Sequence, residues 1–282
     1  MGDSVIDKLR QVDRTVLTTG AGSGIGLAAA IEIARRGFHS VAGVRSPAKA
    51  KIVAREAKKA GVKVQAVMLD VTNVDECRAA IHDLKPYGLI NNAGVAASGA
   101  VEDVSDTEAR QAFETMVLGP MRLARLALKP MREQGGGRIV NISSIYGLMT
   151  TPLTGWYQAS KHALEALSDA LRVEVASDEI SVILIEPGAF RSNIWDSATN
   201  DVQRRLASDY FAAYSRLESG IRASQRLMGD PFEVGRLIAS VLAVKNPKPR
   251  YLVGYDARAI EIYSKLLPTE VRDRLARLTL GL

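Results

Sequence analysis

The chain has 282 residues, of which 47% are hydrophobic and 24% are charged, a balance typical of globular proteins with one sizeable core. Its 37 lysines and arginines exceed its 31 aspartates and glutamates, but the basic residues are dispersed, so a nucleic-acid partner is not expected. A single cysteine, Cys77, excludes an internal disulfide, and with only three dispersed histidines we expect no metal site.

This cysteine content fits a reducing, cytoplasmic setting. The first residues, MGDSVIDKLRQVDR, contain no apolar run, and the apolar stretches elsewhere have the length of strands. We therefore expect neither a signal peptide nor a membrane span.

Short β-branched runs alternate along the chain with amphipathic segments of helical period. This alternation predicts an α/β fold, with a doubly wound parallel sheet of about seven strands and helices on both faces, in a single domain over 1–282. The expected strands are Thr15–Thr19, Ser40–Val44, Val62–Leu69, Gly88–Asn91, Arg138–Ser143, Ser181–Glu186 and Tyr251–Val253.

The first expected strand runs directly into TGAGSGIG, residues 19–26, and then into a helical segment. Glycines at such a turn let the backbone approach a pyrophosphate, which lies at the positive N-terminal end of the helix. The literal G-x-G-x-x-G string is absent, because the glycines follow G-x-x-x-G-x-G through Gly20, Gly24 and Gly26. The strand–turn–helix context favours dinucleotide binding over an ordinary cap or loop.

Arg45 follows the second expected strand, in VAGVRS, where NAD-binding folds of this kind carry a carboxylate for the ribose 2′-hydroxyl. A cation there would pair with a 2′-phosphate. We therefore expect NADP(H) as the preferred cofactor, with NAD(H) as the alternative if Arg45 is only a solvated surface charge.

Tyr157 and Lys161 are four residues apart in the helical segment GWYQASKHALEAL. At 100° per residue, alanines and leucines gather on one side and polar residues on the other, which leaves this pair on the seam. We expect the helix to pack by its alanine-and-leucine side. Taken alone, the pattern favours a packed tyrosine and a lysine whose stem lies on apolar surface.

Three further strings lie where strands are expected to end: NNAG (91–94), ISS (142–144) and EPGAFRS (186–192). Together with TGxxxGxG and Y-x-x-x-K, in this order, they make the chain resemble the short-chain dehydrogenase/reductase family from about Thr15 to Ser192, and again near Tyr251. The residues of GRIVNISSIYG and GWYQASKHALEAL are most similar to those of family branches that act on steroids, retinoids and other lipophilic alcohols or ketones. The resemblance implies a Rossmann fold.

The resemblance also implies that Tyr157 is the acid/base, Lys161 its activator and Ser144 the hydroxyl that orients the substrate. The chemistry agrees, because hydride transfer to a carbonyl leaves an alkoxide that needs a proton donor within about 3 Å. A lysine ammonium one helical turn away stabilises the phenolate and lowers the pKa of the tyrosine.

The family's cofactor site follows the carboxyl ends of the strands. Asp70 is expected beside the adenine, the NNAG residues beside the ribose, and Pro187 and Gly188 beside the nicotinamide; ordinary turn and cap chemistry is the alternative for each. The expected cofactor-binding residues are Gly20, Gly22, Ser23, Gly24, Ile25, Gly26, Arg45, Asp70, Val71, Asn92, Ala93, Gly94, Tyr157, Lys161, Pro187, Gly188, Phe190 and Ser192.

Met116 departs from the family pattern, because it stands where the family usually has asparagine, three residues before Gly119 in FETMVLGP. That asparagine supports a water-mediated proton relay to the lysine and a local break in the helix. A thioether cannot donate or accept equivalently. Three explanations of Met116 follow. The relay runs through a backbone carbonyl and water, the enzyme is slower, or the residue at this position has been altered.

The core is expected over 14–190, a substrate lid over 190–231, and a closing helix, strand and tail over 232–282. The lid segment is too long for a simple turn and has its own helical pattern. Its apolar residues are also typical of simple packing: Ile194, Trp195, Tyr210, Phe211, Tyr214 and Met228.

The leading hypothesis is an NAD(P)-dependent oxidoreductase that transfers a hydride between nicotinamide and a lipophilic secondary alcohol or ketone. The alternative is a dinucleotide-binding sensor or scaffold whose turnover is impaired by Met116. The resemblance further implies a homodimer or homotetramer formed through the helices that carry FETMVLGP and GWYQASK.

Overall fold

Seven parallel strands form one sheet in the order β3-β2-β1-β4-β5-β6-β7 in the computed structural model, which describes residues 14–205, 207–254, 257 and 267–282. The order reverses between β1 and β4, which is the topological switch point of a doubly wound sheet. The predicted Rossmann-type α/β fold is therefore confirmed. The strands are β1 Thr15–Thr18, β2 His39–Val44, β3 Gln65–Met68, β4 Gly88–Asn91, β5 Gly137–Ile142, β6 Ile180–Pro187 and β7 Arg250–Val253.

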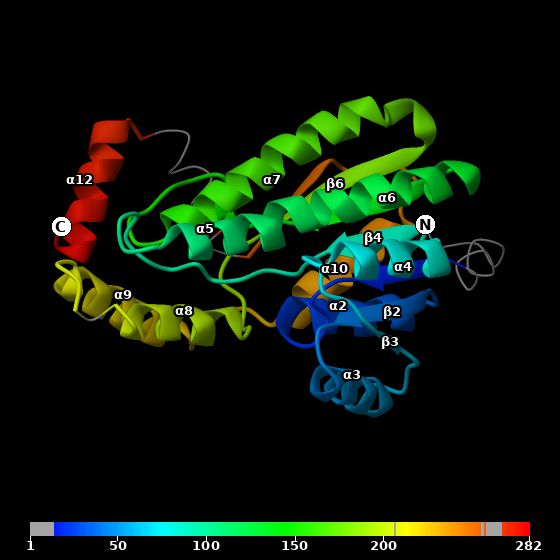
Figure 1. Cartoon of the computed structure of the whole chain (residues 1–282), viewed down its shortest axis with the longest axis horizontal. Coiled ribbons are helices and arrows are strands. Elements are labelled where there is room, and N and C mark those ends of the chain that lie inside the picture. The colour runs from blue at the N-terminus through cyan, green and yellow to red at the C-terminus, as the bar shows by residue number, and fades with distance from the viewer. Residues whose placement is uncertain (1–13, 206, 255–256, 258–266) are drawn as a thin grey trace.

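Helices cover both faces of the sheet (Figure 1). Successive side chains of a strand point to opposite faces, so Val16 packs with α2 (Gly24–Arg35) and α10 (Pro231–Ala243), and Leu17 packs with α4 (Val74–Leu84) and α6 (Gly119–Glu133). Burial on both faces explains why the strands read as continuous apolar runs. The face of α2 also carries α3 (Pro47–Lys59).

The edge strand β3 is shorter than its apolar run suggests. We predicted a strand over 62–69, but only Gln65–Met68 pairs with β2. The amide of Val62 donates instead to the carbonyl of Ala57, 3.0 Å away, and so closes the end of α3. The first residues of the run therefore complete the C-terminal end of α3 instead of extending β3.

The catalytic-motif helix α7 (Gly155–Glu174) does not pack by its alanine-and-leucine side, and that prediction is wrong. Ala159, Leu167 and Ala170 are exposed. The buried residues are largely polar: Gln158, Ser160, Lys161, Leu164, Glu165 and Ser168. The periodicity was misleading because these polar groups have partners inside the protein, and a hydrogen-bonded polar group tolerates burial.

The segment after β6 forms α8 (Ile194–Gln203) and α9 (Phe211–Ser224), which lie together at one end of the molecule (Figure 1). The C-terminal helix α12 (Thr269–Leu280) packs against α9. No helix among the described residues is long and apolar enough to cross a bilayer. Residues 1–13 and, within the tail predicted after Tyr251, residues 255–256 and 258–266 lie outside the described part of the chain.

Candidate active site

The glycine turn and the NNAG segment meet where the sheet order reverses. The Thr19 hydroxyl accepts hydrogen bonds from the amides of Asn92 (3.0 Å) and Ala93 (3.1 Å). In return the Asn92 side-chain amide donates to the main-chain oxygens of Thr19 (3.0 Å) and Gly20 (3.2 Å). Two predicted cofactor segments, 73 residues apart in the chain, are thus joined.

The glycine turn is built for close backbone approach. Gly20 and Gly24 have φ angles of +64° and +53°, which favour glycine. A Cβ atom on Gly26 would lie 2.6 Å from the carbonyl oxygen of Gly20, and one on Gly24 would lie 2.8 Å from the Cβ of Ser192. Ser23 caps α2 without a side-chain hydrogen bond, so the first amides of this helix keep their donors for a ligand. These residues fit a dinucleotide pyrophosphate.

Arg45 is exposed directly after β2, at the position where we expect the adenosine ribose. Lys49, on the first turn of α3, was missed in the sequence. A Cβ atom on Gly22 would lie 2.9 Å from the Cβ of Lys49, so the stem of this lysine crosses the glycine turn. The available signal was a lysine four residues after Arg45, at the start of a helix.

Asp70 and Val71 follow β3; the contacts of the Asp70 carboxylate are local, whereas the carbonyl of Val71 accepts from Arg122, 2.6 Å away. One oxygen of the Asp70 carboxylate accepts from both the amide (2.9 Å) and the hydroxyl (2.8 Å) of Thr72. Val71 is buried beside Gly119. This is the turn chemistry named as the alternative for Asp70, and contact with adenine stays a prediction.

Ser144, Tyr157 and Lys161 lie together after β5. The Ser144 side chain lies close enough to Tyr157 to favour its phenolate, and the Ser144 hydroxyl accepts from the Tyr146 amide, 3.2 Å away. The Tyr146 ring stands edge-on to Tyr157, with 6.3 Å between ring centroids. The ammonium nitrogen of Lys161 is 5.6 Å from the centroid of the Tyr157 ring.

Burial moves the pKa values of both ionisable groups. It raises the pKa of Tyr157 to about 12, while the Ser144 hydroxyl acts in the opposite direction by favouring the phenolate. It lowers the pKa of Lys161 to about 8, while the negative charge of Glu165 acts in the opposite direction. Without a cofactor, the proton therefore stays on Tyr157 at neutral pH.

Met116 is buried at the middle of a π-helical turn, Glu114–Leu118, between α5 (Asp106–Phe113) and α6. Its sulfur lies 3.7 Å from the point that a Cβ atom on Gly94 would occupy. The helix break that the family associates with asparagine is thus present with methionine. Single π-turns of this kind often mark functional sites.

The EPGAFRS segment links the site to β7 and to the lid. Pro187 ends β6, and the amide of Gly188 donates to the carbonyl of Val253, 2.8 Å away. The Phe190 ring is buried against Gly229, so its side chain serves packing, and its carbonyl accepts from the Trp195 indole, 2.8 Å away. Ser192 meets the glycine turn at Gly24.

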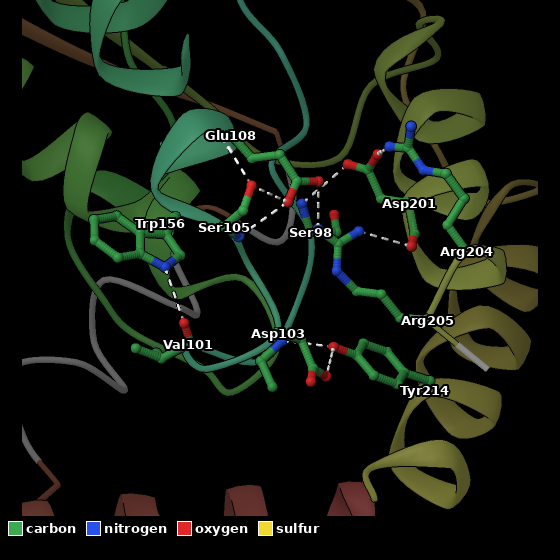
Figure 2. A network of polar contacts seen from close by, with 11 residues as sticks. Ser98, Val101, Asp103, Ser105, Glu108, Trp156, Asp201, Arg204, Arg205 and Tyr214 are labelled. Atoms are coloured by element: carbon green, nitrogen blue, oxygen red, sulfur yellow. Dashed lines mark hydrogen bonds and ion pairs between the residues drawn. The ribbon is translucent and has the colours of Figure 1, made fainter. Parts of the chain in front are cut away.

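The segment 190–231, expected to form a lid, is held to the β4–α5 loop and to α5 by polar contacts (Figure 2). The Tyr214 hydroxyl donates to Asp103 at 2.7 Å and accepts from the amide of Ala100 at 2.7 Å. Arg205 pairs with Glu108 at 2.6 Å. The sequence presented Tyr214 only as an apolar lid residue, because polar partners more than 100 residues away leave no local signal.

The model of the family described as short chain dehydrogenase matches residues 14–203. Among curated proteins, the chain is 33% identical to a 3-ketodihydrosphingosine reductase of Bacteroides thetaiotaomicron, over 85% of this chain and 87% of that protein. It is 30% identical to retinol dehydrogenase 5 of Mus musculus, over 93% of this chain and 87% of that protein. These matches agree with the resemblance drawn from the motifs.

Among solved structures, the chain is similar to a variant of actinorhodin polyketide ketoreductase with NADPH. The TM-score is 0.73 and the identity is 27%, over 86% of this chain and 96% of that chain. The likeness therefore extends over nearly the whole of the solved chain.

Proposed function

The chain belongs to the short-chain dehydrogenase family, an oxidoreductase family, and on that premise we propose that it interconverts a ketone and a secondary alcohol with NADP(H). The observation that carries the proposal is the cluster of Ser144, Tyr157 and Lys161 after β5, in the same parallel sheet whose strand β1 leads into the glycine turn. It joins a proton donor, an orienting hydroxyl and a cation in one place.

Tyr157 donates its proton to the carbonyl oxygen of the substrate in the direction of reduction. Its raised pKa, about 12, keeps that proton in place until the oxygen becomes basic. The Ser144 hydroxyl orients the same oxygen and stabilises its developing charge. The Lys161 ammonium then stabilises the phenolate that remains. A bound nicotinamide supplies the hydride and, when oxidised, a nearby positive charge.

The chain's own residues account for a preference for NADP(H). The amides at the start of α2 and the glycines of the turn would hold the pyrophosphate. Arg45 and Lys49 would hold a 2′-phosphate, for which two cations at a ribose are suited. The NADPH present in the similar ketoreductase supports this choice.

A lipophilic substrate is supported by the apolar underside of the lid, the segment 190–231. Ile194, Trp195 and Ile221 pack with Ala96 of the β4–α5 loop, so the lid presents apolar side chains toward the loop after β4. The relatives named for a ketosphingolipid and for retinol act on substrates of this kind. We place a lipophilic ketone or alcohol under this lid.

A homodimer or homotetramer is supported by the exposed side of α7 and of the π-helical turn. Leu118 is 53% exposed, Leu167 42% and Val173 73%, and exposed apolar side chains of this size favour an interface. The same alanine-and-leucine side that we expected in the core therefore becomes the proposed contact between subunits.

Oxidation of NADPH across a panel of long-chain and polycyclic ketones tests the proposed function. We expect Tyr157→Phe to abolish turnover and Ser144→Ala to reduce it by about 10²-fold or more. Ser143→Ala is the matched control, because it removes the neighbouring hydroxyl. The sensor or scaffold function, favoured only by Met116, would be correct if NADPH bound with no turnover on any ketone. Undiminished turnover in Tyr157→Phe would refute the role of the tyrosine.

A further inference from the structure

Arg250, at the start of β7, binds three carboxylates at once. It donates to Glu165, to Asp169 (2.6 Å) and to Glu186 (2.5 Å). Glu165 and Asp169 lie on α7, and Glu186 lies at the end of β6. This Arg250 cluster therefore fixes the helix that carries Tyr157 and Lys161 to the two last strands of the sheet.

Glu165 is held differently from its neighbour on the helix. Asp169 is 42% exposed in its side chain and has a second cation, Arg172, at 2.6 Å. The Glu165 side chain is only 8% exposed, and one of its two oxygens binds Arg250. Its other oxygen, Oε1, is buried without a hydrogen-bond partner among the described residues.

The free oxygen of Glu165 faces the segment that carries Ser144. A Cβ atom on Gly147 would lie 3.1 Å from this oxygen and 2.7 Å from the hydroxyl of Ser143, which also has no partner in the described chain. A buried carboxylate oxygen without a donor costs free energy unless a cation compensates it. One guanidinium shared among three carboxylates compensates it only in part.

Lys161 is the cation placed to complete that compensation. It lies one helical turn before Glu165 on the same buried side of α7. Its ammonium donates to the carbonyl oxygen of Ile142, 2.8 Å away, directly before Ser143. The other ionisable groups on the elements around it include Tyr157, His162, Asp169 and Arg172 on α7, Glu114 on the π-helical turn, Tyr146 after β5, Glu186 on β6 and Arg250 on β7. The charge of Glu165 raises the pKa of Lys161.

We propose that Glu165, held in place by Arg250, is a positioning residue that keeps Lys161 in its ammonium form beside Tyr157. This role rests on the proposed function of Lys161 as activator of the tyrosine.

The test measures the protonation of Lys161 in the cofactor-free protein, by NMR titration of ¹³C-labelled lysine side chains. Lys161→Arg assigns the signal. We expect a midpoint near pH 8 in the natural chain. In Glu165→Gln we expect a midpoint lower by about one unit, which is a tenfold change in the ratio of ammonium to amine. Glu165→Asp keeps the charge and should restore most of the shift.

Asp169→Asn is the matched control, because it removes another carboxylate of the Arg250 cluster, one turn farther from Lys161. We expect its midpoint to equal that of the natural chain. If Glu165→Gln does not fold, Glu165→Met removes the charge and the unpaired oxygen with an apolar side chain of similar length, and the same lower midpoint is expected. An unchanged midpoint in whichever of these variants folds would overturn the proposal.

The pH profile of turnover provides the second readout. Loss of the Glu165 charge should move the limb that depends on Lys161 to lower pH in Glu165→Gln and not in Asp169→Asn. If the natural chain turned over no ketone, the proposed function would fail, whereas the NMR midpoints would still decide the role of Glu165.

Discussion

The hydroxyl of Tyr214, on α9, lies 2.7 Å from the carboxylate of Asp103, in the loop between β4 and α5. The tyrosine is fully buried, and burial raises its pKa to about 12, so it stays a hydrogen-bond donor. Ser208 donates to the same carboxylate, also at 2.7 Å. The segment expected to form the lid is therefore anchored at a half-buried carboxylate rather than only by apolar packing.

We expect Tyr214→Phe to destabilise the protein by about 1–3 kcal/mol, because the amide of Ala100 loses its buried acceptor and Asp103 loses a donor. Urea denaturation measures the free energy of unfolding. Tyr210→Phe, on a less buried tyrosine at the start of the same helix, is the control and should cost less. An equal loss of unfolding free energy in the two variants would show that the contacts of the Tyr214 hydroxyl stabilise the protein no more than those of Tyr210.

We expect Arg45→Asp to lower the affinity for NADPH relative to NADH by about 10-fold or more, because a cation that binds a phosphate is replaced by an anion. Lys49→Ala should lower the same ratio to a smaller extent. Dissociation constants from calorimetry measure both. Arg55→Ala is the control on α3, where the exposed Arg55 pairs only with Glu56 among the described residues. An unchanged ratio in Arg45→Asp would exclude the proposed 2′-phosphate contact.

Gly26→Ala should abolish cofactor binding and lower stability, because its methyl group would lie 2.6 Å from the carbonyl of Gly20 and would push Asn92 aside. Gly220→Ala is the matched control on α9, where a Cβ atom meets nothing within 4 Å. We expect that change to stabilise the helix by about 0.5–1 kcal/mol. Cofactor titration with thermal unfolding distinguishes the two sites.

The sheet could be predicted from the sequence because both of its faces are buried, so each strand is a nearly continuous apolar run. The motif residues could also be located, since they follow the carboxyl ends of those strands. The glycine turn and the NNAG segment meet through Thr19 as that logic requires.

The packing of α7 could not be predicted in this way. Its buried side carries Gln158, Glu165 and Ser168, whose partners are Thr151, Arg250 and Asn141. Hydrophobic periodicity ignores such partners, because they lie outside the helix, and Arg250 is 85 residues away from Glu165. The same limitation hid the Tyr214–Asp103 contact.

We expect Met116→Asn to change turnover by less than about threefold and to destabilise the protein by about 1–3 kcal/mol. The π-helical turn is already formed with methionine, and the new amide would be buried where the sulfur now packs against Gly94. Steady-state kinetics and urea denaturation check the two parts. A large rise in turnover would show instead that the missing asparagine limits the natural enzyme.

The buried Lys161 should make stability depend on pH. Its pKa is lowered from 10.5 to about 8, so between these values the unfolded chain binds more protons than the folded one, and stability rises with pH in this window. Below pH 8 the lysine is charged in both states and the full cost of burial applies, at most about 3 kcal/mol.

Lys161→Met removes this titration. We therefore expect the variant to be most favoured over the natural chain at pH 7 to 8, and its relative advantage to shrink as the pH approaches 10. Any constant difference, such as the lost hydrogen bond to Ile142, cancels from this trend. Urea denaturation at several pH values measures it, with Lys129→Met, an exposed lysine on α6, as the control. A difference between Lys161→Met and the natural chain that stays constant from pH 8 to 10 would mean that the folded protein does not hold this lysine at a lowered pKa.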